Sequence, residues 1–278
     1  MKSLQARLKM QPLMKSYEDI SRWFSTPLGR RLLIHERKAV SEELRYLFGY
    51  HFMQLSSVRS ANFGSASRIN HCFNLAPIET RLSEGQCAQA VSSYEELPIA
   101  DEMVDVTVLH HVLEFSENPH QVLKEAARVT IPRGYIIIIA FNPISIMGLV
   151  HKMSALFTRD AVSKRRSLRS GRLVDWLEFL DFSCVTNRNV YHNIPVNNAR
   201  FLASTSMLDK LRFKNKMPGG MSYVLVARKD KVGLTPIKPT WEKAGILDAM
   251  PIGKQAVKTG AQKQGLIVPF RPRAKREV

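Results

Sequence analysis

The apolar residues of this chain are most concentrated between positions 97 and 142. Residues 104–109 form a short run rich in β-branched side chains, which is typical of a buried strand. Residues 119–129 repeat apolar side chains at the three-and-four spacing of one helical face, and residues 135–141 form a second apolar run. Both faces of that second strand must be covered. The pattern therefore predicts a right-handed strand–helix–strand crossover in a parallel sheet.

Hydrophobic periodicity predicts further elements on both sides of this crossover. Residues 17–47 carry a helical stripe of leucines, and Pro27 suits the first turn of a long helix capped by Ser25 or Thr26. Helices are also predicted at 171–180 and 197–216. The remaining strands are predicted at 48–56, 68–75, 89–92, 182–191 and 221–228.

Composition divides the chain into three parts. We predict an N-terminal helical extension over 1–47, an α/β domain over 48–228 and a basic tail over 229–278. The tail holds 11 Lys/Arg against 4 Asp/Glu with scattered Pro and Gly, a composition that favours an extended or disordered segment. Apolar runs stay too short for a transmembrane helix, and the basic N-terminus lacks the apolar core of a secretory signal.

Four segments of the central stretch carry a specific pattern: Leu97-Pro98-Ile99, Val104-Asp105, His111-Val112-Leu113-Glu114 and Arg128-Val129-Thr130-Ile131-Pro132-Arg133-Gly134. With these segments the stretch resembles the class I S-adenosylmethionine (SAM)-dependent methyltransferases of the type-11 branch. It implies a Rossmann-like α/β fold with a mostly parallel seven-stranded sheet between helices, SAM as cofactor and methyl transfer as the reaction. Phe141-Asn142-Pro143-Ile144-Ser145 also resembles a bacterial subset with a degenerate glycine-rich loop.

The resemblance places SAM at the carboxyl ends of the first four strands, where this chain departs from the family pattern. Gln54 replaces the acid of the usual Asp-x-Gly-x-Gly-x-Gly loop, of which only Gly64 remains. Asn74 stands for the acid that holds the ribose, and Ser93 for the Asp that contacts the adenine. The predicted cofactor-binding residues are Gln54, Leu55, Ser56, Ser57, Gly64, Asn74, Ser93 and Leu109.

Two adjacent histidines follow the predicted fourth strand. His110 is the candidate general base, because an imidazole at a strand end can take a proton from the acceptor. His111 and Glu114 belong to the family's His-Val-Leu-Glu segment and are expected to be structural. The more common role of a strand-end histidine is also structural, in packing and hydrogen bonding.

The net charge of +17 lies outside the central region, since residues 51–150 hold 6 Lys/Arg against 10 Asp/Glu. A basic cluster follows the predicted fifth strand: Lys164, Arg165, Arg166, Arg169 and Arg172. Its position predicts an anionic acceptor, which can be a nucleic acid, a phosphorylated metabolite or an acidic lipid. The alternative is a solvated loop that serves solubility.

The cysteines, Cys72, Cys87 and Cys184, are odd in number and widely spaced, so neither a disulfide framework nor a metal site is predicted. This usage fits a reducing cytoplasm. The favoured function is methyl transfer from SAM to an unidentified acceptor. The alternatives are a non-catalytic relative that acts as a basic binding or scaffold module, and an RNA-associated protein recruited through its basic flanks.

Overall fold

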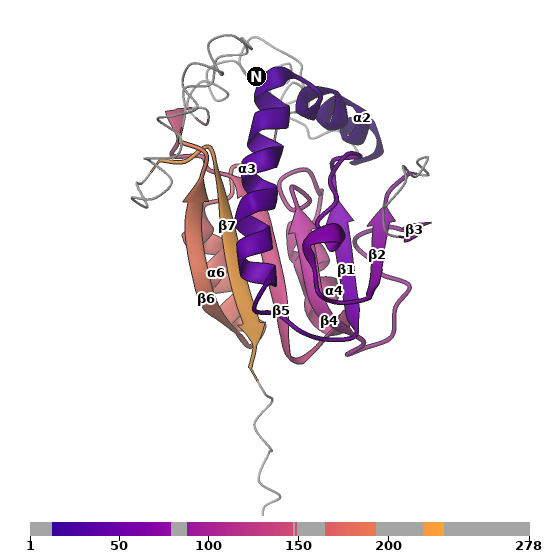
Figure 1. Cartoon of the computed structure of the whole chain (residues 1–278). Coiled ribbons are helices and arrows are strands. Elements are labelled where there is room, and N and C mark those ends of the chain that lie inside the picture. The colour runs from indigo at the N-terminus through magenta and orange to yellow at the C-terminus, as the bar shows by residue number, and fades with distance from the viewer. Residues whose placement is uncertain (1–12, 79–87, 147, 149–164, 193–218, 231–278) are drawn as a thin grey trace, which may run out of the picture. The chain divides into compact units, whose positions relative to one another are not determined.

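The computed structural model describes residues 13–78, 88–146, 148, 165–192 and 219–230 (Figure 1). All of them lie within the first of two compact units, residues 1–233 and 234–278. The helix predicted at 197–216, Lys164, Cys87 and nearly all of the predicted tail lie outside the described residues. The boundaries of the three predicted parts stay predictions.

The described elements alternate as expected for an α/β domain. In chain order they are α2 (Leu13–Phe24), α3 (Pro27–Leu44), β1 (His51–Ser56), the 3-10 helix η1 (Gly64–Ala66), β2 (His71–Ala76), β3 (Ala88–Val91), β4 (Val104–His110), α4 (Pro119–Val129), β5 (Thr130–Phe141), α6 (Ser170–Phe179), β6 (Phe182–Val190) and β7 (Ser222–Lys229).

These strands form one seven-stranded sheet in the order β3-β2-β1-β4-β5-β7-β6. Strands β1 to β5 run parallel to one another, and β7 is antiparallel to both β5 and β6. The strand order reverses between β1 and β4, the switch point at which open α/β sheets bind ligands beyond the carboxyl ends of their strands. The predicted Rossmann-like architecture is confirmed.

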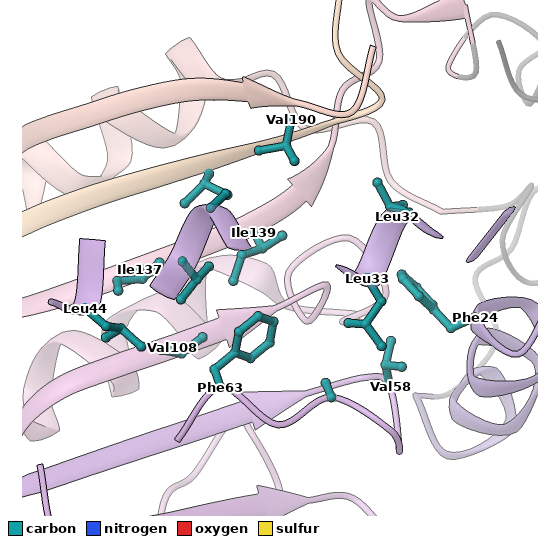
Figure 2. Close-up of a cluster of buried hydrophobic side chains, with 14 of the residues drawn as sticks. Phe24, Leu32, Leu33, Leu44, Val58, Phe63, Val108, Ile137, Ile139 and Val190 are labelled. Atoms are coloured by element: carbon teal, nitrogen blue, oxygen red, sulfur yellow. The ribbon is translucent and has the colours of Figure 1, made fainter. Parts of the chain in front are cut away.

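Helices cover both faces of the sheet, α3 on one and α4 with α6 on the other (Figure 1). Successive β5 side chains point to opposite faces. Ile137 and Ile139 therefore pack with α3, and Ile136 and Ile138 pack in the cluster that holds α4 and α6. Figure 2 shows the α3 side of this core. A continuous apolar run is thus what a strand buried on both faces requires.

Local signals account for most element boundaries. The Thr26 hydroxyl accepts a hydrogen bond from Gly29 N at 3.2 Å, so Thr26 caps α3 ahead of Pro27 as predicted. Helix α4 has the predicted bounds. Strand β5 begins earlier than predicted, because Thr130 pairs with Val104 directly after the helix and the register then shifts before Val106.

Gly49 precedes β1 at a point of close backbone approach. A Cβ on Gly49 would lie 2.4 Å from Asp105 Cβ and Cγ. The Asp105 carboxylate accepts hydrogen bonds from Tyr50 N and His51 N, both at 2.9 Å, and so holds the start of β1 beside β4. A side chain at position 49 has to displace that carboxylate.

We expect Gly49→Ala to lower the free energy of unfolding by about 1–3 kcal/mol, the scale of overpacking in a filled site. The measurement is urea denaturation of the full chain. Gly171→Ala is the control, because nothing lies within 4 Å of a Cβ there and alanine favours a helix. Equal stability of the two variants would show that the Asp105 contact does not constrain position 49.

Candidate functional site

The carboxyl ends of β1 and β4 lie side by side and bring most of the predicted site residues together. Ser56 pairs with His110 in the parallel register, and the Ser56 Oγ lies 2.9 Å from His110 Nδ1. Ser57 N donates to His110 O at 3.1 Å. The predicted residues at this strand pair are all buried: Gln54, Leu55, Ser56, Ser57, Leu109 and His110.

Gln54 holds the loop that follows β1. Its amide Nε2 donates to Ala61 O at 2.8 Å, and its Oε1 accepts from Phe63 N at 2.9 Å. A carboxylate cannot donate the first of these bonds, so the amide suits this loop better than the family's acid. The described chain between β1 and β2 holds only the short helix η1, and Gly64 begins it. The glutamine thus braces a loop that relatives build from glycines.

We expect Gln54→Glu to destabilise the protein by about 1–3 kcal/mol near pH 7, because a carboxylate would face Ala61 O without a donor in a buried place. Thermal or urea unfolding measures it. Gln121→Glu is the control: Gln121 also donates to a backbone oxygen, Glu95 O at 3.2 Å, but at an exposed position where water can replace the bond. A similar loss in both variants would argue against the bracing role.

A buried cluster of acids and histidines lies just beyond Ser56. Glu36, from α3, places Oε2 at 3.2 Å from His110 Nε2 and Oε1 at 3.1 Å from His111 Nε2. Glu114 Oε2 lies 2.8 Å from His111 Nδ1, and Glu114 Oε1 accepts from Phe141 N at 2.9 Å. All of these side chains are at most 1% exposed.

Without a bound metal ion, Glu36 is negatively charged at pH 7, His111 is positively charged and His110 is neutral. Burial raises the pKa of Glu36, but His111 and the hydrogen bonds from both histidines outweigh it and lower that pKa to about 2. Burial lowers the pKa of His110 to about 4, so the ring is neutral at pH 7. Burial also lowers the pKa of His111, yet Glu36 and Glu114 raise it to about 9.

The backbone and aromatic neighbours fix the two histidines. His111 has φ 52°, in the left-handed region, and its N donates to Ile139 O at 2.9 Å. The Phe24 ring, at the end of α2, lies 5.7 Å from the His110 ring and 5.2 Å from the His111 ring. The N-terminal helices therefore reach the carboxyl edge of the sheet.

The basic cluster after β5 divides into two parts. Arg165 is largely buried, with its guanidinium 4.4 Å from the Phe141 ring centre and its Nε 3.9 Å from Glu114 Oε1. Arg166 donates through its backbone N to Glu114 O and through Nη2 to Glu117 O. These two residues attach the segment to the sheet edge.

The second part of the basic cluster faces a pocket. Arg169 and Arg172 are exposed and line a hollow of about 390 Å³. Its other lining residues are Pro143, Ile144 and Ser167. Pro143 follows β5 and Arg169 precedes α6, so this pocket lies at the carboxyl end of β5. It is partly open to solvent, and its lining combines two arginines with two apolar residues.

The remaining predicted site residues lie on β2 and after β3. Asn74 pairs with Gln54 across β1 and β2. Its buried Oδ1, and the buried Oγ of Ser57, have no hydrogen-bond partner among the described residues. Such orphaned polar atoms are rare in folded proteins and call for a ligand, a water or an ion. Ser93 is exposed and accepts from Glu95 N at 3.3 Å in the turn after β3.

Sequence reasoning missed Glu36 and Tyr94. Glu36 stands among Leu32, Leu33 and Val40 on the buried stripe of α3, and a lone acid on an apolar stripe was the available signal. Tyr94 is buried, and its hydroxyl lies 2.8 Å from Ser56 O. Nothing in the pattern around Tyr94 indicated that contact.

Comparison with known proteins agrees with this architecture. Residues 70–138 match the family model described as a methyltransferase domain. The chain is 29% identical to the uncharacterised protein YafS of Escherichia coli K12 over 245 residues, which cover 86% of this chain and 94% of that protein.

Two solved structures show the same fold. A SAM-dependent methyltransferase of Thermotoga maritima has a TM-score of 0.54 at 17% identity, covering 75% of this chain and 94% of that one. A complex of the Haloferax volcanii Trm112 methyltransferase activator with a methyltransferase has a TM-score of 0.54 at 13% identity. The match covers 78% of this chain and 98% of that one. The match to the methyltransferase domain and this shared fold support a class I SAM-dependent methyltransferase of the type-11 branch. The family match indicates SAM as its cofactor.

The residues at the strand ends fit SAM in two places. The orphaned oxygens of Ser57 and Asn74 are acceptors for ligand hydroxyl or amino groups, at the end of β1 and on β2, in the region where the resemblance predicts the cofactor. Ser56 and Ser57 are small enough for a ligand to approach their backbone. Among the described residues, no helix is long and apolar enough to cross a membrane.

Proposed function

We propose that this methyltransferase holds SAM along the carboxyl edge of β1, β2 and β4 and acts on an anionic acceptor in the cytoplasm. The observation that carries the proposal is the pair of orphaned buried oxygens, on Ser57 and Asn74, beside the switch point of the sheet. The pocket lined by Arg169 and Arg172 supports the acceptor class, because it lies at the end of the neighbouring strand β5.

The protein's contribution to the methyl donor is to bind SAM and to orient it. Ser57 and Asn74 would accept hydrogen bonds from SAM, and Leu55, Leu109 and Gly64 would supply apolar or small neighbours. When bound, SAM supplies an electrophilic methyl group. Methyl transfer needs the donor carbon in line with an acceptor atom, so the rate depends on how firmly both partners are positioned.

His110 as general base stays a prediction. Both of its ring nitrogens are within hydrogen-bond distance of protein atoms, Ser56 Oγ and Glu36 Oε2, and its side chain is fully buried. A base has to reach the proton that it removes. The geometry therefore supports His110 better as a positioning residue, which holds the end of β1 against β4 through Ser56.

On the acceptor side, the arginines select for negative charge. Two exposed guanidiniums at a pocket of about 390 Å³ raise the local concentration of anions and can bind phosphate or carboxylate in two-point fashion. Ile144 gives the same pocket an apolar wall. A phosphorylated metabolite, a nucleotide of RNA or an acidic headgroup each has this chemistry.

The competing function is that of a non-catalytic module that keeps the fold. The observation that favours it is that the polar side-chain atoms of Gln54 and His110 form hydrogen bonds with other protein groups. These atoms therefore do not face an open cleft. Such a protein would bind anionic partners, including nucleic acid, through its basic flanks. Binding of the cofactor product separates the two functions directly.

We expect S-adenosylhomocysteine to bind the full chain, with Ser57→Ala and Asn74→Leu each weakening binding about 2- to 12-fold, the worth of one hydrogen bond. Isothermal titration calorimetry measures this. Ser183→Ala, on the edge strand β6, is the control. Absence of binding to the unmodified chain at millimolar ligand would favour the non-catalytic module, and binding unchanged in both variants would place the cofactor elsewhere.

Replacing Arg169 and Arg172 together by Gln should weaken binding to a short single-stranded RNA or to anionic vesicles and flatten its salt dependence. Two lost phosphate contacts lower the slope of log K against log salt by about 1.4 for a single strand. The matched control replaces the exposed Arg45 and Arg133, which lie near the opposite edge of the sheet. If both double variants bind alike, the pocket does not hold the acceptor.

A further inference from the structure

We propose that Glu36, His110 and His111 form a closed site for one divalent transition-metal ion, of which zinc is the best match, joining α3 to the end of β4. This inference is independent of the methyl transfer proposed above. It concerns a cluster that no sequence pattern indicated, because its acid and its histidines lie more than 70 positions apart in the chain.

The donor set is that of a transition-metal site. The Nε2 atoms of His110 and His111 both face the Glu36 carboxylate, at 3.2 and 3.1 Å, and one ligand atom from each residue lies within 4.8 Å of the others. Two imidazoles with a carboxylate suit Zn²⁺ and its neighbours, whereas Ca²⁺ and Mg²⁺ prefer oxygen ligands alone. Both oxygens of Glu36 are available, which gives four donors.

The outer partners of the two histidines are those of metal ligands. Ligating histidines usually donate their other ring N–H to a carboxylate or another oxygen, which fixes ring orientation and tautomer. Here His111 Nδ1 lies 2.8 Å from Glu114 Oε2, and His110 Nδ1 lies 2.9 Å from Ser56 Oγ. Glu114 is itself held by Phe141 N. Both Nε2 atoms, which face Glu36, are thereby the nitrogens left to bind the metal.

Ser56 can accept the tautomer that a metal ligand requires of His110. Ser56 Oγ lies 3.1 Å from Val58 O, to which it can give its single proton. His110 Nδ1 can then donate its own proton to Ser56 Oγ, which leaves the Nε2 lone pair for the metal. Without metal, Nε2 of His110 instead donates to Glu36 Oε2 at 3.2 Å.

Burial indicates that the ion would have a structural role. Glu36, His110 and His111 have fully buried side chains, so the site is closed, as structural zinc sites are. A divalent ion there is neutralised by the carboxylates of Glu36 and Glu114. Because the ligands come together only in the folded chain, bound metal would stabilise the native state.

The test is the metal content of tag-free full-length protein, grown with added zinc, gel-filtered and analysed by elemental mass spectrometry. We expect about one zinc per chain, with His110→Gln and Glu36→Gln losing most of it, and a thermal midpoint that falls when a strong chelator removes the ion. His51→Gln is the control, because His51 and His71 form an exposed pair with Nδ1 atoms 2.8 Å apart that could take up metal.

Three outcomes would overturn the site: unmodified protein that stays metal-free after purification and after incubation with Zn²⁺, equal metal in His110→Gln and unmodified protein, or loss of metal in His51→Gln but not in His110→Gln. If Glu36→Gln fails to fold, Co²⁺ added to unmodified protein and to His110→Gln decides. Visible d–d absorption of Co²⁺ in the unmodified protein that is absent from His110→Gln supports the site. Matching spectra of the two proteins contradict it.

Discussion

The carboxylate of Glu36, buried between two histidines, is the interaction on which the rest of the structure depends. An isolated buried charge is too costly to keep, so α3 has to lie where His110 and His111 can meet it. That position brings the leucines of α3 onto the sheet. The same histidines end β4, and through Glu114 they fix Phe141 at the end of β5. One charged cluster thus fixes the positions of α3, of the ends of β4 and β5, and of the segment that carries Arg165.

This arrangement explains how the fold accommodates a degenerate glycine loop. The described chain between β1 and β2 has no long helix, and α3 and Phe63 fill much of that face of the sheet instead. Gln54 then takes over the loop bracing that tight glycine turns give elsewhere. The buried side-chain oxygens of Ser57 and Asn74 have no hydrogen-bond partner among the described residues. They mark the place where a ligand would complete the hydrogen bonding. The acceptor side keeps an open, cationic pocket beyond β5.

Most of the fold could be predicted from the sequence, but less of the site could. The hydrophobic period, together with Pro119 in the first turn, predicted the bounds of α4, because burial on one face forces that spacing. It placed the start of β5 too late, since Pro132 and Gly134 look like a turn although the strand passes through them. Resemblance located the strand ends but treated Gln54 as a weakened cofactor ligand, and only side-chain contacts reveal its bond to Ala61 O. Glu36 could be noticed only as a lone acid on the apolar stripe of α3, because its partners are distant in sequence.

The most direct measurement is a double-mutant cycle on Glu36 and His111. The free energy of unfolding in urea is determined for the unmodified protein, for Glu36→Gln, for His111→Gln and for the variant that carries both changes. Both single changes leave a buried group without its charged partner, whereas the double change removes the pair. We expect the two changes to be strongly non-additive, with a coupling of about 2–3 kcal/mol. Additive losses, with a coupling near zero, would contradict the claim that this contact holds α3 over the ends of the strands.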